Sequence, residues 1–155
     1  MSNAISQPAV LPAMGVHLSD ETFLDVRFHE VDSYHIVWHG HYVNYLEVGR
    51  ETFGAKYGLS YQHLLDRGVR APIIHVSVNY RRSLKYGDKV RILTEYVVRP
   101  QAKICFRYTL TSPDGTTVYC RAETEQVLQD AETGRTLPRL PDWHATWLAR
   151  AKFLA

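Results

Sequence analysis

The chain of 155 residues has the size of one ordinary domain, long enough to bury a core. Lys and Arg total 18 against 16 Asp and Glu, so neither a nucleic acid nor a membrane is indicated as a partner. The two cysteines lack CxxC spacing, which argues against a disulfide framework and a cysteine zinc site. No run approaches the roughly 20 apolar residues of a membrane span, so no transmembrane segment is expected. The cytoplasm is the expected location.

The first predicted segment is a loose leader at residues 1–20. It mixes Ser, Pro, Ala and Gly without a period and lacks the basic start and apolar block of a signal peptide. A single domain is expected at 21–155. Apolar Leu24, Val26 and Phe28 alternate with polar residues, which predicts the first strand there.

A helix is predicted to follow from Tyr42 to about Gly58. Tyr42, Leu46, Gly49 and Phe53 recur at steps of four, three and four, which places them on one helix face, and Gly58 is a natural stop. Gly49 weakens a helix, so its expected use is to let the helix backbone pass close over a sheet.

Beyond a short second helix at 61–66, four segments alternate with a period of two and predict strands two to five: 74–80, 90–98, 104–110 and 118–122. The joints "KYGD" (85–88), "RPQAK" (99–103) and "SPDG" (112–115) carry turn residues, and each is short enough for an antiparallel hairpin. Behind a possible cap at Asp142, Trp143, Trp147 and Ala151 lie four apart and predict a C-terminal helix.

This order of elements predicts an α+β fold, in which a long central helix is wrapped by a curved antiparallel sheet of about five strands, with a short C-terminal helix added. A sheet with open edges gains from pairing with a second copy, so a homo-oligomer, either a dimer or a tetramer, is expected.

The stretch "VRFHEVDSYHIVWHGHYVNYLEVGRE" resembles the signature of hotdog-fold acyl-CoA thioesterases of the 4-hydroxybenzoyl-CoA thioesterase type. That signature has an acid, a short loop, Ile-Val or Val-Val, an aromatic residue, and then His or Tyr opening the central helix. "NYRRSLKYGDKV" and "DAETGRTLPRLPDW" are also similar to later parts of the family. One departure is His35, which stands where the family commonly has a glycine.

The residues themselves suggest a chemistry for thioester hydrolysis. Asp32, at the mouth of a helix, is suited to act as general base on water or to attack the carbonyl carbon itself. Backbone N–H groups at the helix start, where His39 and Gly40 stand, are suited to hold the developing oxyanion. The resemblance implies that the N–H at position 39 is the oxyanion donor.

Other residues have competing interpretations. His35, His39 and His41 do not follow a standard zinc spacing, and no metal or cofactor is expected. Glu47 is either a surface carboxylate paired with Arg50 or an alternative acid, because a related hotdog branch carries its acid on the helix. Trp38 and Tyr42 are candidates to line an acyl pocket, or are ordinary core residues.

Basic residues are candidates for binding phosphates on the substrate's carrier. Arg99 and Lys103 match the family by their position in the hairpin between the third and fourth strands, and the pair Arg81 and Arg82 is a second choice. Exposed charges of this kind otherwise form a solvated face.

Three functions remain open, and each would take an acyl-CoA or acyl-carrier-protein thioester as its partner. The first is a thioester hydrolase. The second is a hotdog hydratase or dehydratase, in which His35 or His39 would work with Glu47. The third is a non-catalytic subunit that binds acyl thioesters. No motif of a serine hydrolase, a dinucleotide enzyme, a nucleoside-triphosphatase or a zinc protease is present.

Overall fold

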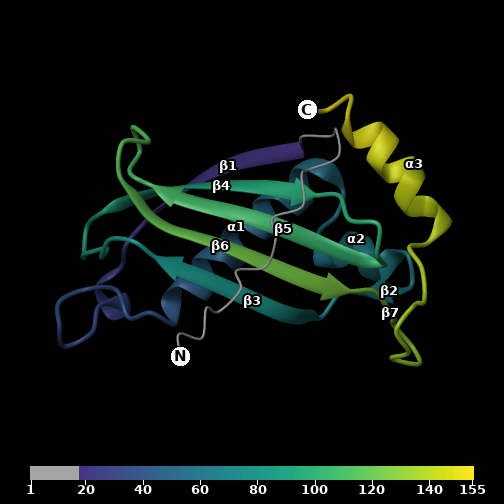
Figure 1. Ribbon diagram of the computed structural model, residues 1–155, viewed down its shortest axis with the longest axis horizontal. Helices are drawn as coiled ribbons and strands as arrows, with labels where there is room; N and C mark the ends of the chain where they lie inside the picture. The colour runs from purple at the N-terminus through teal and green to yellow at the C-terminus, as the bar shows by residue number, and fades with distance from the viewer. Residues whose placement is uncertain (1–17) are drawn as a thin grey trace, which may run out of the picture.

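A computed structural model describes residues 18–155. The long helix α1 (His41–Tyr57) packs against one face of a five-stranded antiparallel sheet with strand order β1-β4-β5-β6-β3 (Figure 1). The strands are β1 (Leu18–Asp25), β3 (Ile73–Tyr80), β4 (Lys89–Val97), β5 (Lys103–Thr111) and β6 (Val118–Val127). The predicted α+β arrangement is confirmed.

The face of α1 predicted from the sequence spacing is the buried one. Tyr42, Leu46 and Phe53 are at most 3% exposed, and Phe53 packs edge-on against Phe106 of β5. Gly58 ends the helix in the left-handed conformation, with φ of 72°. These residues join the helix to the core of the sheet.

Gly49 lies where α1 approaches the sheet most tightly. A Cβ atom built on Gly49 would lie 2.5 Å from Oγ1 of Thr94 and 2.9 Å from Cγ2 of Ile92, both on β4. Only glycine fits this contact without displacing the strand. The close approach predicted from the sequence is therefore confirmed.

Two of the three predicted hairpins are present, and one is not. The turns at 99–103 and 112–117 join β4 to β5 and β5 to β6, which are paired neighbours. The "KYGD" turn does form, with Gly87 at φ of 84°, but β3 and β4 are separated by β5 and β6. Segment 81–88 is thus a crossover spanning about 15 Å, three inter-strand spacings. Leu84 of this crossover is fully buried, and its carbonyl accepts the backbone N–H of Val37, next to the start of α1.

The first strand was placed wrongly by the sequence pattern. β1 runs from Leu18 to Asp25, whereas Phe28–Glu30 forms a short 3-10 turn, η1, in which Phe28 is 80% exposed. β1 is an edge strand that pairs with β4 along its whole length, and backbone pairing does not require an apolar alternation. Residues 18–20 of the expected leader belong to β1; the rest of the leader lies outside the described residues.

The remaining elements are short. The predicted second helix is confirmed as α2 (Tyr61–Asp66), and a two-stranded ribbon pairs β2 (Val69–Arg70) with β7 (Gln129–Asp130). The C-terminal helix α3 (Asp142–Ala151) is also confirmed, but Pro141 occupies its N-cap and Asp142 is its first residue rather than the cap. Trp147 is 5% exposed and donates its indole N–H to the Tyr57 carbonyl at 2.6 Å. No helix within residues 18–155 is long and apolar enough to cross a bilayer.

Candidate active site

Asp32 stands on a short loop whose two ends are tied together. Val31 and Val37 form an isolated antiparallel bridge, and the Asp32 N–H donates to the Ile36 carbonyl at 2.9 Å. The Asp32 carboxylate is half-buried, and its Oδ1 accepts the Tyr34 N–H at 2.8 Å. Oδ2 has no hydrogen-bond partner within residues 18–155. The loop therefore holds the acid in place while leaving one oxygen open.

His35 is the residue that makes this loop tight. Its φ is 61°, in the left-handed region, and no other non-glycine residue between 18 and 155 has a positive φ. The family's usual glycine suits such an angle, whereas a histidine adopts it at a cost of about 1 kcal/mol. The departure noted in the sequence thus leaves the sharp turn intact.

The start of α1 presents unpaired amides. The N–H groups of His41, Tyr42 and Val43 donate to the carbonyls three residues before them. The N–H groups of His39 and Gly40, the two residues just before His41, have no acceptor within the described part of the chain. They lie at the positive end of the helix dipole, so this position favours a negative charge.

Asp32 and His39 line one cavity of about 330 Å³. Its other walls come from Tyr42 of α1, from Tyr80 at the end of β3, and from the crossover that follows β3. The Tyr80 hydroxyl donates to the His39 carbonyl at 2.9 Å, and the Tyr80 ring packs edge-on against Tyr42. A carboxylate and the residue before the start of α1 therefore line one open pocket.

Below this loop lies a buried carboxylate that the sequence reasoning did not identify. Glu30 is 1% exposed and accepts hydrogen bonds from the Arg27 backbone and guanidinium and from the Tyr45 hydroxyl, at 2.8 to 3.1 Å. Desolvation raises the pKa of Glu30, but these hydrogen bonds outweigh it and hold the pKa below its ordinary value. Because every bond of Glu30 is internal, its role is to anchor the 3-10 turn η1, which leads into the Asp32 loop.

The other predicted site residues are dispersed. Trp38 is 48% exposed and packs against the rings of His39 and His41, outside the cavity lining. Glu47 is bonded to Arg50 and to the Tyr61 hydroxyl, as expected of a carboxylate paired along the helix, and it does not line the cavity either.

Arg99 and Lys103 lie in the turn between β4 and β5. That turn follows β4, whereas the crossover that lines the cavity precedes β4, so the nine residues of β4, about 30 Å in length, lie between them along the chain. Lys103 is paired with Glu125 at 2.6 Å. Their role in substrate binding stays a prediction that this protomer's geometry does not support.

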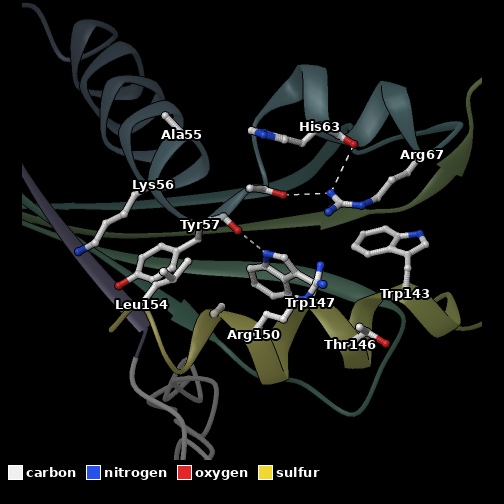
Figure 2. A pocket seen from close by; sticks show the side chains of 12 residues that line it. Ala55, Lys56, Tyr57, His63, Arg67, Trp143, Thr146, Trp147, Arg150 and Leu154 are labelled. Atoms are coloured by element: carbon white, nitrogen blue, oxygen red, sulfur yellow. Dashed lines mark hydrogen bonds between the residues drawn. The ribbon is translucent and has the colours of Figure 1, made fainter.

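A second cavity, of about 600 Å³, lies at the other end of α1, against α2 and α3 (Figure 2). Arg67 there donates to the carbonyls of Gly58 and His63 and stacks 4.7 Å over Trp143. Lys56 and Arg150 belong to the last turns of α1 and α3, where cations offset the negative end of the helix dipole. The His63 ring is bonded at the start of α2, where its Nδ1 accepts the Ser60 N–H at 3.3 Å. Arg67, Lys56 and Arg150 thus each have a structural role at a helix end.

No group of three or more His, Cys, Asp or Glu side chains in residues 18–155 is placed to hold a metal ion. His39 is exposed and His41 half-buried, and both pack against Trp38.

Comparisons with known proteins agree with this geometry. The sequence model described as "Thioesterase-like superfamily" matches residues 26–148. The protein named "Putative acyl-CoA thioesterase YneP" from Bacillus subtilis strain 168 is 26% identical over 135 residues, which cover 85% of this chain and 96% of that protein.

Solved structures share the fold. DHNA-CoA thioesterase from Staphylococcus aureus superposes with a TM-score of 0.75 at 24% identity, covering 88% of this chain and 92% of that one. A variant of 4-hydroxybenzoyl-CoA thioesterase in complex with 4-hydroxybenzoyl-CoA gives a TM-score of 0.71 at 20% identity, covering 84% and 98%. The hotdog fold expected from the sequence is confirmed.

Proposed function

The chain belongs to the thioesterase-like superfamily, and on this basis we propose that it hydrolyses the thioester of an acyl-CoA, or of an acyl-carrier protein, to a free acid and a thiol. The observation that carries the proposal is the shared cavity, an open pocket lined both by the half-buried Asp32 and by His39, just before the start of α1.

The reaction assigns a role to each group. Asp32 acts through its open oxygen, either by taking a proton from the attacking water or by attacking the thioester carbon and forming an anhydride that water then cleaves. The N–H of His39, with that of Gly40 beside it, receives the carbonyl oxygen as it becomes negative. The C–S bond breaks, and the thiolate leaves without a dedicated acid because it is a stable anion.

The competing hydratase proposal needs a histidine and an acid that face one another. Glu47, its expected acid, is held by Arg50 and Tyr61 and does not line the cavity that contains His39. This arrangement favours hydrolysis with Asp32 as the only acid in the lining.

The assembly is proposed to be a homodimer or a higher homo-oligomer joined along β3. Among residues 18–155, this strand pairs only with β6, and its apolar side chains Ile74 and Val76 are 52% and 37% exposed. An open edge with exposed apolar residues is suited to pair with the same edge of a second copy.

The experiment that tests the function is thiol release from a panel of acyl-CoAs by wild type and by Asp32→Asn. The loss of general-base or nucleophilic action is expected to lower kcat by a factor of about 10² or more. Asp25→Asn, an exposed acid outside this cavity, is the matched control and should keep the wild-type rate. Full activity of Asp32→Asn with an unchanged circular dichroism spectrum would refute the proposal.

A further inference from the structure

Arg81 and Arg82, the second choice for phosphate binding in the sequence, lie at the Asp32 cavity. Arg81 and Arg82 directly follow β3 and begin the crossover to β4, and both line the cavity together with Asp32 and His39. Their backbone N–H groups both donate to the Tyr119 carbonyl of β6, at 2.8 and 3.1 Å. Both side chains are exposed, yet their attachment points are fixed to the sheet.

Neither guanidinium has an internal partner. Within residues 18–155, no hydrogen bond or ion pair engages the side chain of Arg81 or Arg82. Many other cations of the protein are paired with acids, among them Arg27, Arg50, Lys56, Lys89, Arg91, Lys103 and Arg107. The two arginines are therefore available to a ligand at no cost in internal contacts.

The charge of the cavity favours an anion. Among the lining residues within 18–155, Asp32 is the only acid, and it stands against two arginines. A guanidinium binds phosphate and carboxylate oxygens through paired N–H donors, and two on adjacent residues can address one group together. By contrast, Arg99 and Lys103 lie beyond the far end of β4 and do not line this cavity.

We propose that Arg81 and Arg82 form an anion-binding rim of the Asp32 cavity that holds an oxyanion-bearing part of the thioester substrate. The inference rests on the proposed thioesterase function. Two parts of a substrate carry such oxygens: a phosphate of the carrier arm and a carboxylate at the far end of the acyl group. Both would be recognised by the same chemistry.

The test compares wild type with Arg81→Gln/Arg82→Gln on four thioesters. One uncharged acyl group and one ω-carboxyacyl group are each presented on CoA and on N-acetylcysteamine, which has no phosphate. The double variant should raise KM about tenfold or more for the thioesters that carry the recognised anion, with kcat changed less than about threefold. Arg121→Gln, an exposed and unpaired arginine of β6 outside this cavity, is the matched control and should change neither.

The pattern of KM identifies the source. A rise confined to the two CoA thioesters assigns the rim to the carrier phosphates, and a rise confined to the two ω-carboxyacyl thioesters assigns it to the acyl group. Equal KM values for wild type and the double variant on all four would overturn the proposal, as would an equal rise with the Arg121→Gln control.

A separate measurement keeps the inference distinct from the proposed function. If wild type turns over none of the thioesters, the hydrolase proposal fails, and calorimetric titration with coenzyme A and with an ω-carboxyacyl N-acetylcysteamine thioester still tests the rim. Weaker binding of either probe to the double variant than to the Arg121→Gln control supports the rim, and equal binding of both removes it. Sedimentation of the double variant should match wild type. If the two arginines served only to prevent other strands from pairing with the edge of β3, their loss would change association and leave KM unchanged.

Discussion

Tyr80 influences the proposed site through a single hydroxyl. The bond from that hydroxyl to the His39 carbonyl fixes the residue whose N–H is proposed to receive the oxyanion. Because the peptide unit is planar, holding this carbonyl also sets the direction of the Gly40 N–H. Tyr80 is therefore a positioning residue that touches the site through the backbone.

Removing this hydroxyl should lower turnover more than binding. Tyr80→Phe keeps the ring contact with Tyr42 and is expected to lower kcat by about tenfold with little change in KM, since small misplacements of catalytic groups are costly. Steady-state kinetics on one good acyl-CoA provides the measurement. Tyr86→Phe, which removes the hydroxyl of a 63% exposed ring, should leave both constants unchanged; a kcat for Tyr80→Phe equal to wild type would argue against the positioning role.

Glu30 makes stability depend on pH. Although desolvation acts in the opposite direction, its pKa is lowered in the folded protein by hydrogen bonds from Arg27 and Tyr45. Its contribution is therefore complete above the ordinary glutamate value of about 4.3 and is lost as pH falls through the lower folded value. Glu30→Gln is expected to reduce the free energy of unfolding by about 2 kcal/mol at pH 7. Urea denaturation at pH 7 and at pH 3 should show this difference shrinking at the acidic end. A difference that is constant with pH would mean that the charge of Glu30 is not what stabilises the loop.

At the scale of elements, the close contact between α1 and β4 depends on Gly49, which has no side chain. Gly49→Ala would gain about 1 kcal/mol of helix propensity, but its methyl group would collide with Thr94 and Ile92. Overpacking of this kind costs about 1–3 kcal/mol, so a net loss of about 1 kcal/mol is expected in thermal or chemical denaturation. Val48→Ala, on the exposed side of the same helix, should shift stability by less than about 0.5 kcal/mol. A Gly49→Ala variant as stable as wild type would show that β4 moves aside freely.

Sequence patterns located elements well where one face is buried. The spacing of Tyr42, Leu46 and Phe53 and the two-residue period of β4 and β5 reflect burial on one side, which is why helix and strands agree with the prediction. The first strand was predicted too late in the chain because β1 is stabilised by backbone pairing and by surface ion pairs such as Glu21 with Arg91. Such contacts do not require a regular alternation of apolar and polar residues in the sequence.

The same limit applies to the crossover after β3. Its turn residues Lys85 to Asp88 are visible in the sequence, and the turn forms, but a turn does not specify which strands it joins. Strand order is decided by pairing partners distant in the chain, so the local pattern of residues 81–88 predicts a hairpin that the fold does not contain. The placement of Arg81 and Arg82 beside Asp32 follows from this crossover and was not accessible from local pattern.

For the whole molecule, the open edge of β3 determines the expected assembly. Ile74→Lys/Val76→Lys places two charges on this edge and is expected to convert a dimer into monomers, because burying them without partners is unfavourable. Sedimentation equilibrium measures the change. Phe23→Lys, on the exposed surface of β1 at the opposite edge, should leave the dimer intact. A monomeric wild type, or dissociation by Phe23→Lys as well, would exclude assembly along β3.

The candidate site as a whole is only partly visible in the sequence. Asp32, His39 and Gly40 belong to one continuous stretch, so their proximity could be expected from the start of a helix alone. Tyr80 comes from a strand forty residues later, and only the folded chain brings its hydroxyl to the His39 carbonyl. The sequence around Glu30 indicates nothing about its burial beyond the presence of a second acid, Asp32, two residues later.

The backbone bridge between Val31 and Val37 holds Asp32 in place whatever side chains stand at the tip of the loop. Ser33 and Tyr34 are exposed at the tip, and Tyr34 borders the cavity. Randomising positions 33 and 34 would therefore vary the side chains at the tip of this loop, beside the cavity, while the backbone bonds keep Asp32 anchored. A combinatorial library limited to these two codons, assayed on acyl-CoAs of different lengths, would measure how far this tip sets the acyl preference of the proposed thioesterase.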